Sequence, residues 1–357
     1  MARSLAADLQ RADPGANIVI HNDFAVLGRL LGRRLARGYA FHLRDARRSY
    51  DIAYRLFTGL RAAQTLGELA LYALGGTPLA RTISAIDPDV VVATHPVLNA
   101  VLARLRATRR VPCPAAVVVG PLGGLGFWVQ PGADLHLLNY PEALREVQRE
   151  AAPGSAVAVR PLVGEEFFFA PTQARARAQL GIPTQRPLVL ISGGGWGAGD
   201  LHGAIDAALN IPDAAVIAVA GQNQRVPAAI TQRHDGDPRL TLVGFTTRMC
   251  ELLSAADAFV TTTAGLSCLE AQLCGCPTVW YGFGAGHVQD NVAALQRHGL
   301  ARAAHTPKQL TSQLKAVLAT GRRQRTSASP ELPRAGQLIL ELANHQREPR
   351  SAAVTAG

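Results

Sequence analysis

One acidic side chain in the segment 262–291 has the surroundings of a sugar-binding residue. Glu270 is the only charged residue on a predicted helix, and a turn of small residues, Ala264, Gly265 and Ser267, precedes it. A carboxylate accepts protons from sugar hydroxyls, and backbone N–H groups at a helix N-terminus hold an anion such as phosphate. The pattern therefore indicates a sugar next to a phosphate. The alternative is that Glu270 is an ordinary solvated helix residue.

A glycine-rich segment follows a predicted strand at 187–192 and precedes a predicted helix. Its glycines are Gly193, Gly194, Gly195, Gly197 and Gly199, and the first four are the candidate phosphate-binding residues. Glycines let the backbone approach a ligand closely and direct N–H groups at a phosphate. No GK[ST] follows, so this is not a Walker loop, and it fits GxGxxG only loosely. The alternative is a connecting turn that binds nothing.

Polar residues also follow other predicted strands. His287, Gln289 and Asn291 end a glycine loop after the predicted strand 277–281. His95 lies at the end of the predicted strand 89–96. In a parallel α/β sheet, the loops at the carboxyl ends of neighbouring strands bind ligands. We therefore expect these side chains at such an edge.

The elements that must position these residues alternate between buried strands and helices, as a parallel sheet requires. Apolar runs predict strands at 17–23, 89–96, 114–120, 133–138, 187–192, 215–221, 240–245, 257–262 and 277–281. Helices are predicted at 3–12, over most of 24–75, at 249–256 and at 331–345.

The length of 357 residues favours two domains. We predict an α/β protein with two Rossmann-like, doubly wound domains facing each other across a cleft, which is the default site. The predicted parts are an N-terminal domain 1–165, a linker 166–186, a second domain 187–330, a helix 331–345 and a disordered tail 346–357.

The charge balance favours an anionic partner. The chain has 36 basic and 26 acidic residues and a formal charge of +10. A phosphate-bearing substrate, an acidic membrane or a nucleic acid would fit. No RNA-binding aromatic signature and no zinc-finger spacing is present, which argues against nucleic acid.

A cluster of arginines between residues 29 and 48 has one nearby acid, Asp45. It consists of Arg29, Arg33, Arg34, Arg37, Arg44, Arg47 and Arg48. Each such residue near an anionic lipid surface contributes roughly 1 kcal/mol, so the cluster predicts a membrane contact. The alternative is a solvated helical face.

Cysteine usage and the N-terminus indicate a cytoplasmic protein, with peripheral membrane attachment as an option. The five cysteines form no CxxC pair, and Cys274 and Cys276 are too close for the usual zinc spacing, so we expect free thiols and no metal. The N-terminus lacks the apolar run of a secretory signal. The uncharged stretch 111–133 is broken by prolines and glycines, so it does not predict a membrane-spanning helix.

Together the motifs resemble the C-terminal domain of family 28 glycosyltransferases. The order is the glycine loop, AGQN at 220–223, GF at 244–245, the AGLSCLEAQLCGCP turn and H-x-Q-x-N. DVVVATHPVL and FWVQPGADLHLLNYPEA resemble the N-terminal half of the monogalactosyldiacylglycerol synthases and processive diacylglycerol glucosyltransferases in this family. The resemblance implies the GT-B fold, a UDP-sugar donor, and no bound metal ion or other cofactor.

The resemblance also implies roles for individual residues on the donor side. The glycines at 193–197 would hold the diphosphate, Phe245 would meet the uracil through its backbone, and Glu270 would hold the ribose hydroxyls. The remaining residues that it assigns to the nucleotide sugar are Asn223, Ala264, Gly265, Leu266, Ser267, His287, Gln289 and Asn291.

The chain departs from the family on the acceptor side. It begins inside the first helix of the family, so we expect the first strand and its Gly-Gly-Gly-His loop to be missing. Gly120 and Pro121 replace a threonine-aspartate pair, and Gly164 stands where the family has an arginine. His95 is then the best candidate for the catalytic base, and its alternative is a structural histidine ahead of a proline. His21 and Asp23 rank lower.

These inferences predict an inverting, UDP-sugar-dependent hexosyltransferase that acts on a diacylglycerol-like lipid at the membrane face. One alternative keeps the donor but has a soluble small-molecule acceptor. A second is a non-catalytic or partner-dependent UDP-sugar-binding protein. A sugar-nucleotide epimerase on a similar fold has no specific support in the sequence.

Overall fold

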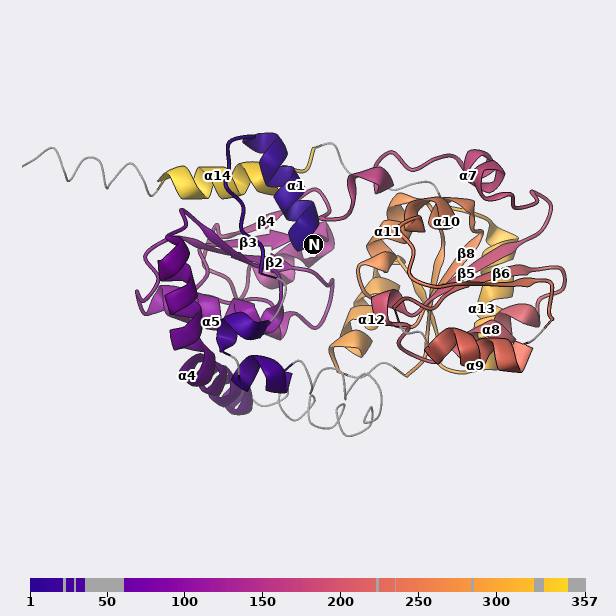
Figure 1. Cartoon of the computed structure of the whole chain (residues 1–357), viewed down its shortest axis with the longest axis horizontal. Helices are drawn as coiled ribbons and strands as arrows, with labels where there is room; N and C mark the ends of the chain where they lie inside the picture. The colour runs from indigo at the N-terminus through magenta and orange to yellow at the C-terminus, as the bar shows by residue number, and fades with distance from the viewer. Residues whose placement is uncertain are drawn as a thin grey trace, which may run out of the picture. The chain divides into compact units, whose positions relative to one another are not determined.

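The computed structural model describes residues 1–21, 24–28, 30–35, 61–222, 225–234, 236–283, 286–323 and 331–345. The chain divides into two compact units (Figure 1). The first contains Met1–Leu162 and Ser329–Gly357, and the second contains Val163–Ala328. The chain therefore returns to the first unit at its C-terminal end.

The first unit is built on a parallel sheet in the order β1-β2-β3-β4. Its strands are β1 (Val91–Ala93), β2 (Ala115–Val119), β3 (Leu135–Leu138) and β4 (Ala156–Ala158). The first three lie inside predicted strands. β4 was not predicted, because a three-residue strand with alanine at both ends carries little apolar signal.

The prediction of a strand at 17–23 is wrong for the residues that the structure describes. Residues 17–21 form no strand, and Val19 and Ile20 are 53% and 37% exposed. An apolar run forms a stable strand only when a neighbouring strand and a core cover it, and here neither does.

Helices from both ends of the chain pack together in the first unit. α1 (Ala2–Ala12) lies beside α14 (Ala335–His345) (Figure 1). Asp8 joins them, because its carboxylate accepts from Arg334 Nη1 at 2.8 Å and from the Gly336 N–H at 2.9 Å. α4 (Arg61–Ile86) and α5 (Pro96–Ala107) also pack against each other. Most of the predicted helical region 24–75 outside α4 lies beyond the described residues.

The second unit has a parallel sheet in the order β10-β9-β8-β5-β6-β7. The strands are β5 (Leu188–Ser192), β6 (Ala215–Val219), β7 (Leu240–Val243), β8 (Ala258–Thr261), β9 (Thr278–Tyr281) and β10 (Arg302–Ala304). The strand order reverses between β5 and β8, which is the switch point where sheets of this kind bind ligands.

Helices cover both faces of this second sheet. α8 (Leu201–Leu209) and α13 (Pro307–Thr320) pack on the face formed by alternate strand residues such as Val189 and Tyr281. The other helices of the unit are α7 (Gln173–Leu180), α9 (Arg225–His234), α10 (Met249–Ala255), α11 (Ser267–Leu273) and α12 (His287–Arg297).

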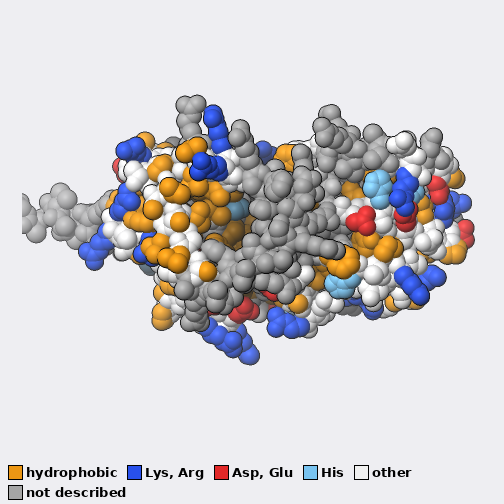
Figure 2. All heavy atoms as spheres, turned by 90° about the horizontal axis from the view of Figure 1, so that it is seen from below, with side chains coloured by type: hydrophobic (Ala, Val, Ile, Leu, Met, Phe, Trp, Pro, Cys, Tyr) orange, Lys and Arg blue, Asp and Glu red, His pale blue; other side chains and the backbone are white. Residues whose placement is uncertain are grey.

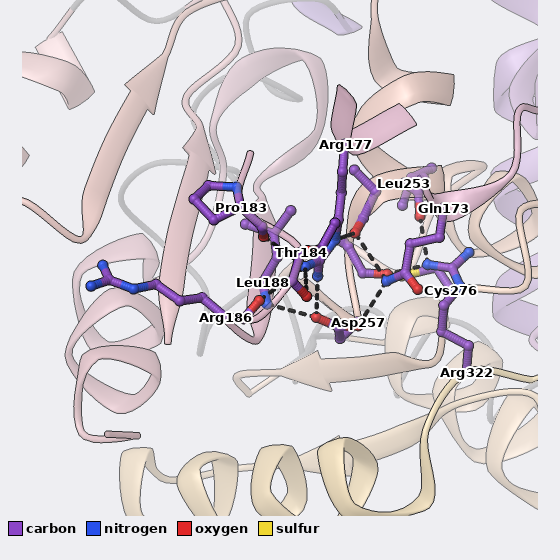
Figure 3. Close-up of polar contacts among 12 residues, drawn as sticks. Gln173, Arg177, Pro183, Thr184, Arg186, Leu188, Leu253, Asp257, Cys276 and Arg322 are labelled. Atoms are coloured by element: carbon purple, nitrogen blue, oxygen red, sulfur yellow. Dashed lines mark hydrogen bonds and ion pairs between the residues drawn. The ribbon is translucent and has the colours of Figure 1, made fainter. Parts of the chain in front are cut away.

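The segment 166–186, expected as a linker, contains α7, which packs against α10. Arg177 holds it there (Figure 3). The guanidinium of this 3%-exposed residue pairs with Asp257 at 2.5 Å and donates to the carbonyls of Pro183, Thr184 and Arg186. The segment is thereby part of the second unit.

Candidate functional site

The structure brings the glycine loop and the turn before Glu270 to one edge of the second sheet. The loop follows β5 and the turn follows β8, and Ser192 and Thr261 are paired at the ends of these neighbouring strands. The Thr262 N–H donates to the Ser192 carbonyl at 3.3 Å, and the Thr262 hydroxyl donates to the Ala198 carbonyl. This edge is the switch point of the sheet.

The glycine loop has a backbone that only glycine allows at its critical positions. Gly194, the first residue of the 3-10 helix η5 (Gly194–Trp196), and Gly197, the residue after it, have φ angles of 69° and 59°. A Cβ on Gly193 would lie 2.6 Å from the Ala198 carbonyl oxygen, which is a steric clash, so no larger residue fits there. The loop is closed by the Ala198 N–H, which donates to the Gly193 carbonyl at 2.8 Å.

One side of the loop remains open. In the part of the chain that the structure describes, the N–H groups of Gly195 and Trp196 donate to no acceptor. No heavy atom lies within 4 Å of a Cβ built on Gly195. Unpaired N–H groups on an open loop are suited to an anion.

The AGQN motif lies against this loop. Gly221 has a φ of 67°, and a Cβ there would lie 2.5 Å from the Gly195 carbonyl oxygen. The Gln222 N–H donates to that same oxygen at 2.8 Å. Asn223 lies outside the described residues. Phe245, after β7, is 61% exposed.

The turn 262–267 presents a second set of backbone N–H groups. Among the described contacts, the N–H groups of Gly265, Leu266 and Ser267 have no acceptor, and α11 begins without a side-chain cap. Ala264 is held at a φ of 47°, which is unfavourable for a residue with a Cβ. The Asn291 side-chain amide donates to the Ala264 carbonyl at 2.9 Å and so fixes this turn.

Glu270 lies in the first turn of α11 and is half-buried. Its side chain forms no hydrogen bond and no ion pair with any residue that the structure describes. Burial raises the pKa of its carboxyl to about 7. A desolvated carboxylate without a partner costs stability, and ligand hydroxyls would satisfy it.

His287, Gln289 and Asn291 do not end a loop as expected, because they belong to the first turns of α12. The spacing i, i+2, i+4 puts His287 and Asn291 on one side of the helix. Burial lowers the pKa of His287. Asn291 supports the 264 turn, so it acts there as a scaffold residue.

His95 lies in the first unit as the N-cap of α5. Its Nδ1 accepts from the Val97 N–H at 3.3 Å, and its ring packs edge-on against Phe24 at 4.9 Å. With Nδ1 as acceptor, a neutral ring carries its proton on Nε2 and is a donor at that atom. This geometry favours the structural role, and the role of base stays a prediction.

Other expected residues are only partly described. His21 is exposed and Asp23 lies outside the described residues. Of the arginine cluster between residues 29 and 48, Arg33 and Arg34 are described and exposed. All five cysteines are buried free thiols, as expected.

No group of three or more His, Cys, Asp or Glu side chains among the described residues could hold a metal ion. No described helix has the length and apolarity that a bilayer crossing requires.

Asp200 and Tyr281 join the site although the sequence did not single them out. The Tyr281 hydroxyl donates to Asp200 Oδ2 at 2.8 Å at the end of the glycine loop. Asp200 has a recognisable signal, because an aspartate before an apolar helix is a typical N-cap. Tyr281 has none, since its partner is 81 residues away in the chain.

Comparisons with known proteins agree with the resemblance seen in the sequence. Residues 1–160 match the family "Monogalactosyldiacylglycerol (MGDG) synthase", and residues 196–320 match "Glycosyl transferases group 1". The chain is 23% identical over 246 residues to monogalactosyldiacylglycerol synthase 1 of Arabidopsis thaliana, covering 65% of this chain and 46% of that protein. It thus spans about half the length of such plant relatives.

Bacterial proteins are similar as well. The chain is 28% identical over 278 residues to the UDP-N-acetylglucosamine–N-acetylmuramyl-(pentapeptide) pyrophosphoryl-undecaprenol N-acetylglucosamine transferase of Salinibacter ruber, covering 74% of this chain and 69% of that one. The crystal structure of Acinetobacter baumannii MurG superimposes with a TM-score of 0.53 at 18% identity, covering 77% of this chain and 78% of that one. The two-sheet α/β architecture predicted from the sequence is confirmed.

Proposed function

Because this chain belongs to the glycosyltransferases of the GT-B fold that resemble monogalactosyldiacylglycerol synthase, we propose that it transfers a hexose from a UDP-sugar to a diacylglycerol-like lipid, with inversion. One observation carries the donor: the half-buried Glu270 lies in the first turn of α11, next to the unpaired N–H groups of the 262–267 turn, at the sheet edge that also carries the glycine loop. A carboxylate next to an anion site fits a ribose next to a diphosphate.

The leaving group is bound by backbone N–H groups in this proposal. The acceptor hydroxyl oxygen attacks the anomeric carbon, the bond from that carbon to the diphosphate oxygen breaks, and UDP departs with the bonding electrons. The N–H groups of Gly195 and Trp196, with those of Gly265, Leu266 and Ser267, stabilise the charge that develops on the diphosphate. The remaining donor contacts stay predictions; they are those of Asn223, Phe245, Ala264, His287, Gln289 and Asn291.

The acceptor hydroxyl must lose its proton to a base. His95 is the predicted base, and it would receive the proton at Nδ1 after releasing the Val97 N–H. Such a step costs one helix-capping hydrogen bond. A pH–rate profile with an acidic limb that His95→Gln removes supports this role, and an unchanged limb contradicts it.

That same histidine geometry favours a second candidate function, a UDP-sugar-binding protein that needs a partner for catalysis. Its donor site would be complete, while its capped His95 would not act as a base. UDP release from UDP-sugars, measured with and without diacylglycerol liposomes, separates the two. Lipid-dependent release supports the transferase. Tight UDP binding with no release under either condition supports the binding protein.

The lipid acceptor has support in the surface of the first unit. Figure 2 shows hydrophobic side chains gathered on one face of this unit with basic side chains at the edges. Leu66 and Leu74 of α4 are 66% and 63% exposed. The membrane contact of the arginine cluster stays a prediction, and salt-sensitive sedimentation with anionic liposomes tests it.

The proposal predicts that UDP binding strengthens as pH rises through about 7. The pKa of Glu270, about 7, means that its carboxylate becomes ionised over this range, and the ionised form accepts protons from both ribose hydroxyls. Calorimetric titration of UDP from about pH 6 to about pH 8 should show the Kd falling severalfold. Glu270→Gln is the control: its side chain does not ionise, so any pH dependence of its Kd comes from other groups, such as UDP itself. Parallel profiles for the two proteins would contradict the assignment.

A further inference from the structure

The carboxyl-terminal end of the glycine loop is held by Asp200, which directly follows the loop, and by Tyr281, which lies 81 residues away in the chain. Asp200 follows the loop and caps α8, because its Oδ1 accepts from the Gly203 N–H at 2.9 Å. Its Oδ2 accepts from the Tyr281 hydroxyl at 2.8 Å. Both carboxylate oxygens are thus used.

Tyr281 reaches this point from the interior of the unit. It is the last residue of β9, is 3% exposed, and packs among the residues between the sheet and α8. Since β8 separates β9 from β5 in the sheet, the hydroxyl connects the loop after β5 to a strand that is not its neighbour.

The space around the pair permits little movement. A Cβ on Gly203 would collide with the Asp200 carboxylate and would lie 2.5 Å from the Tyr281 hydroxyl oxygen. On the other side, a Cβ on Gly199 would collide with the Thr262 side chain, whose hydroxyl bonds to Ala198. Residues 198–200 are therefore fixed from β8, β9 and α8 together.

The charge of Asp200 has its own consequence. A carboxylate at a helix N-terminus interacts favourably with the partial positive charge there. Asp200 therefore occupies the N-terminus of α8, and the phosphates of a nucleotide must rely on the N–H groups of the loop and of the 262–267 turn. The loop must hold its shape for those N–H groups to converge.

We propose that Asp200 and Tyr281 are positioning residues whose hydrogen-bonded pair keeps the glycine loop in its diphosphate-binding shape. The inference rests on the proposed donor site. Neither side chain needs to touch the nucleotide, and each acts through the backbone of residues 198–200. A positioning role predicts a change in UDP affinity larger than the change in stability would explain.

The test is calorimetric titration of the full chain with UDP, together with the thermal midpoint. Tyr281→Phe removes one hydroxyl and is expected to raise the Kd about fivefold or more. Asp200→Ala removes both contacts and is expected to raise it about tenfold or more. Asp200→Asn keeps an acceptor for Gly203 and a donor for the tyrosine oxygen, so binding should stay within about threefold of the wild type.

Thr311→Val is the matched control. It removes a hydroxyl bond of 2.9 Å to the Ala207 carbonyl, at the other end of α8. Its thermal midpoint should fall about as much as that of Tyr281→Phe, while its Kd for UDP stays at the wild-type value.

The possible results distinguish a failure of the positioning role from a failure of the proposed donor site. If the wild type binds UDP and both Tyr281→Phe and Asp200→Ala bind it with the same Kd, the positioning role is overturned and the proposed function stands. Equal weakening by Thr311→Val also overturns it, because the effect would then follow from α8 stability alone. A wild-type protein that binds no UDP overturns both.

Discussion

Replacing Glu270 by alanine is expected to weaken UDP binding by about tenfold to a hundredfold. A hydrogen bond to a charged group contributes about 1.5–3 kcal/mol, and the carboxylate is proposed to accept from the ribose hydroxyls. The side chain makes no hydrogen bond or ion pair with any described residue, so its removal breaks no such contact within the protein. Glu270→Ala should therefore fold as stably as the wild type. Above pH 7 the variant should be slightly more stable than the wild type, because the wild type then carries a half-buried carboxylate with no hydrogen-bond partner among the described residues.

Two variants sharpen this measurement. Glu142→Ala removes an exposed acid from the first unit and should bind UDP as the wild type does. Glu270→Gln keeps the shape and one acceptor oxygen, so its Kd should lie between those of the wild type and Glu270→Ala. Unchanged UDP affinity in Glu270→Ala would remove the donor-site assignment, whatever activity the protein shows.

The sequence predicted the strands of the second unit that carry the proposed donor site, because their signals are local. The glycine loop follows a long apolar strand, and a helix with a single charge, Glu270, follows another. Strands β5 and β8 each carry four or five buried residues in succession, which is the pattern of a sheet covered on both faces. Their adjacency follows from the parallel fold class.

What the sequence could not predict depends on contacts between distant residues. The resemblance assigns Asn291 to the donor sugar, and nothing in the sequence indicates that its side-chain amide donates to the Ala264 carbonyl. The sequence around His95 does not indicate that its Nδ1 accepts a hydrogen bond from the Val97 N–H. The apolar run that contains Val19 and Ile20 has the composition of a strand. It forms none among the described residues, because no neighbouring strand or core covers these side chains.

Replacing Arg177 by methionine is expected to destabilise the second unit by about 3–5 kcal/mol. The guanidinium is buried and joins Asp257, Ala255 and the carbonyls between residues 183 and 186 (Figure 3). Methionine fills similar volume but leaves Asp257, whose side chain is 26% exposed, without its cation. Breaking a buried pair by removing one partner costs about this much.

Amide hydrogen exchange is the appropriate measurement, because it reports the two units separately. Protection of β5 and β8 should fall by about two to four orders of magnitude, while protection of β2 and β3 in the first unit serves as the internal reference. Arg233→Met is the matched control, because its pair with Asp206 is formed by side chains that are 58% and 32% exposed and should contribute less than about 1 kcal/mol. Equal loss of protection in the two variants would contradict the special role of Arg177.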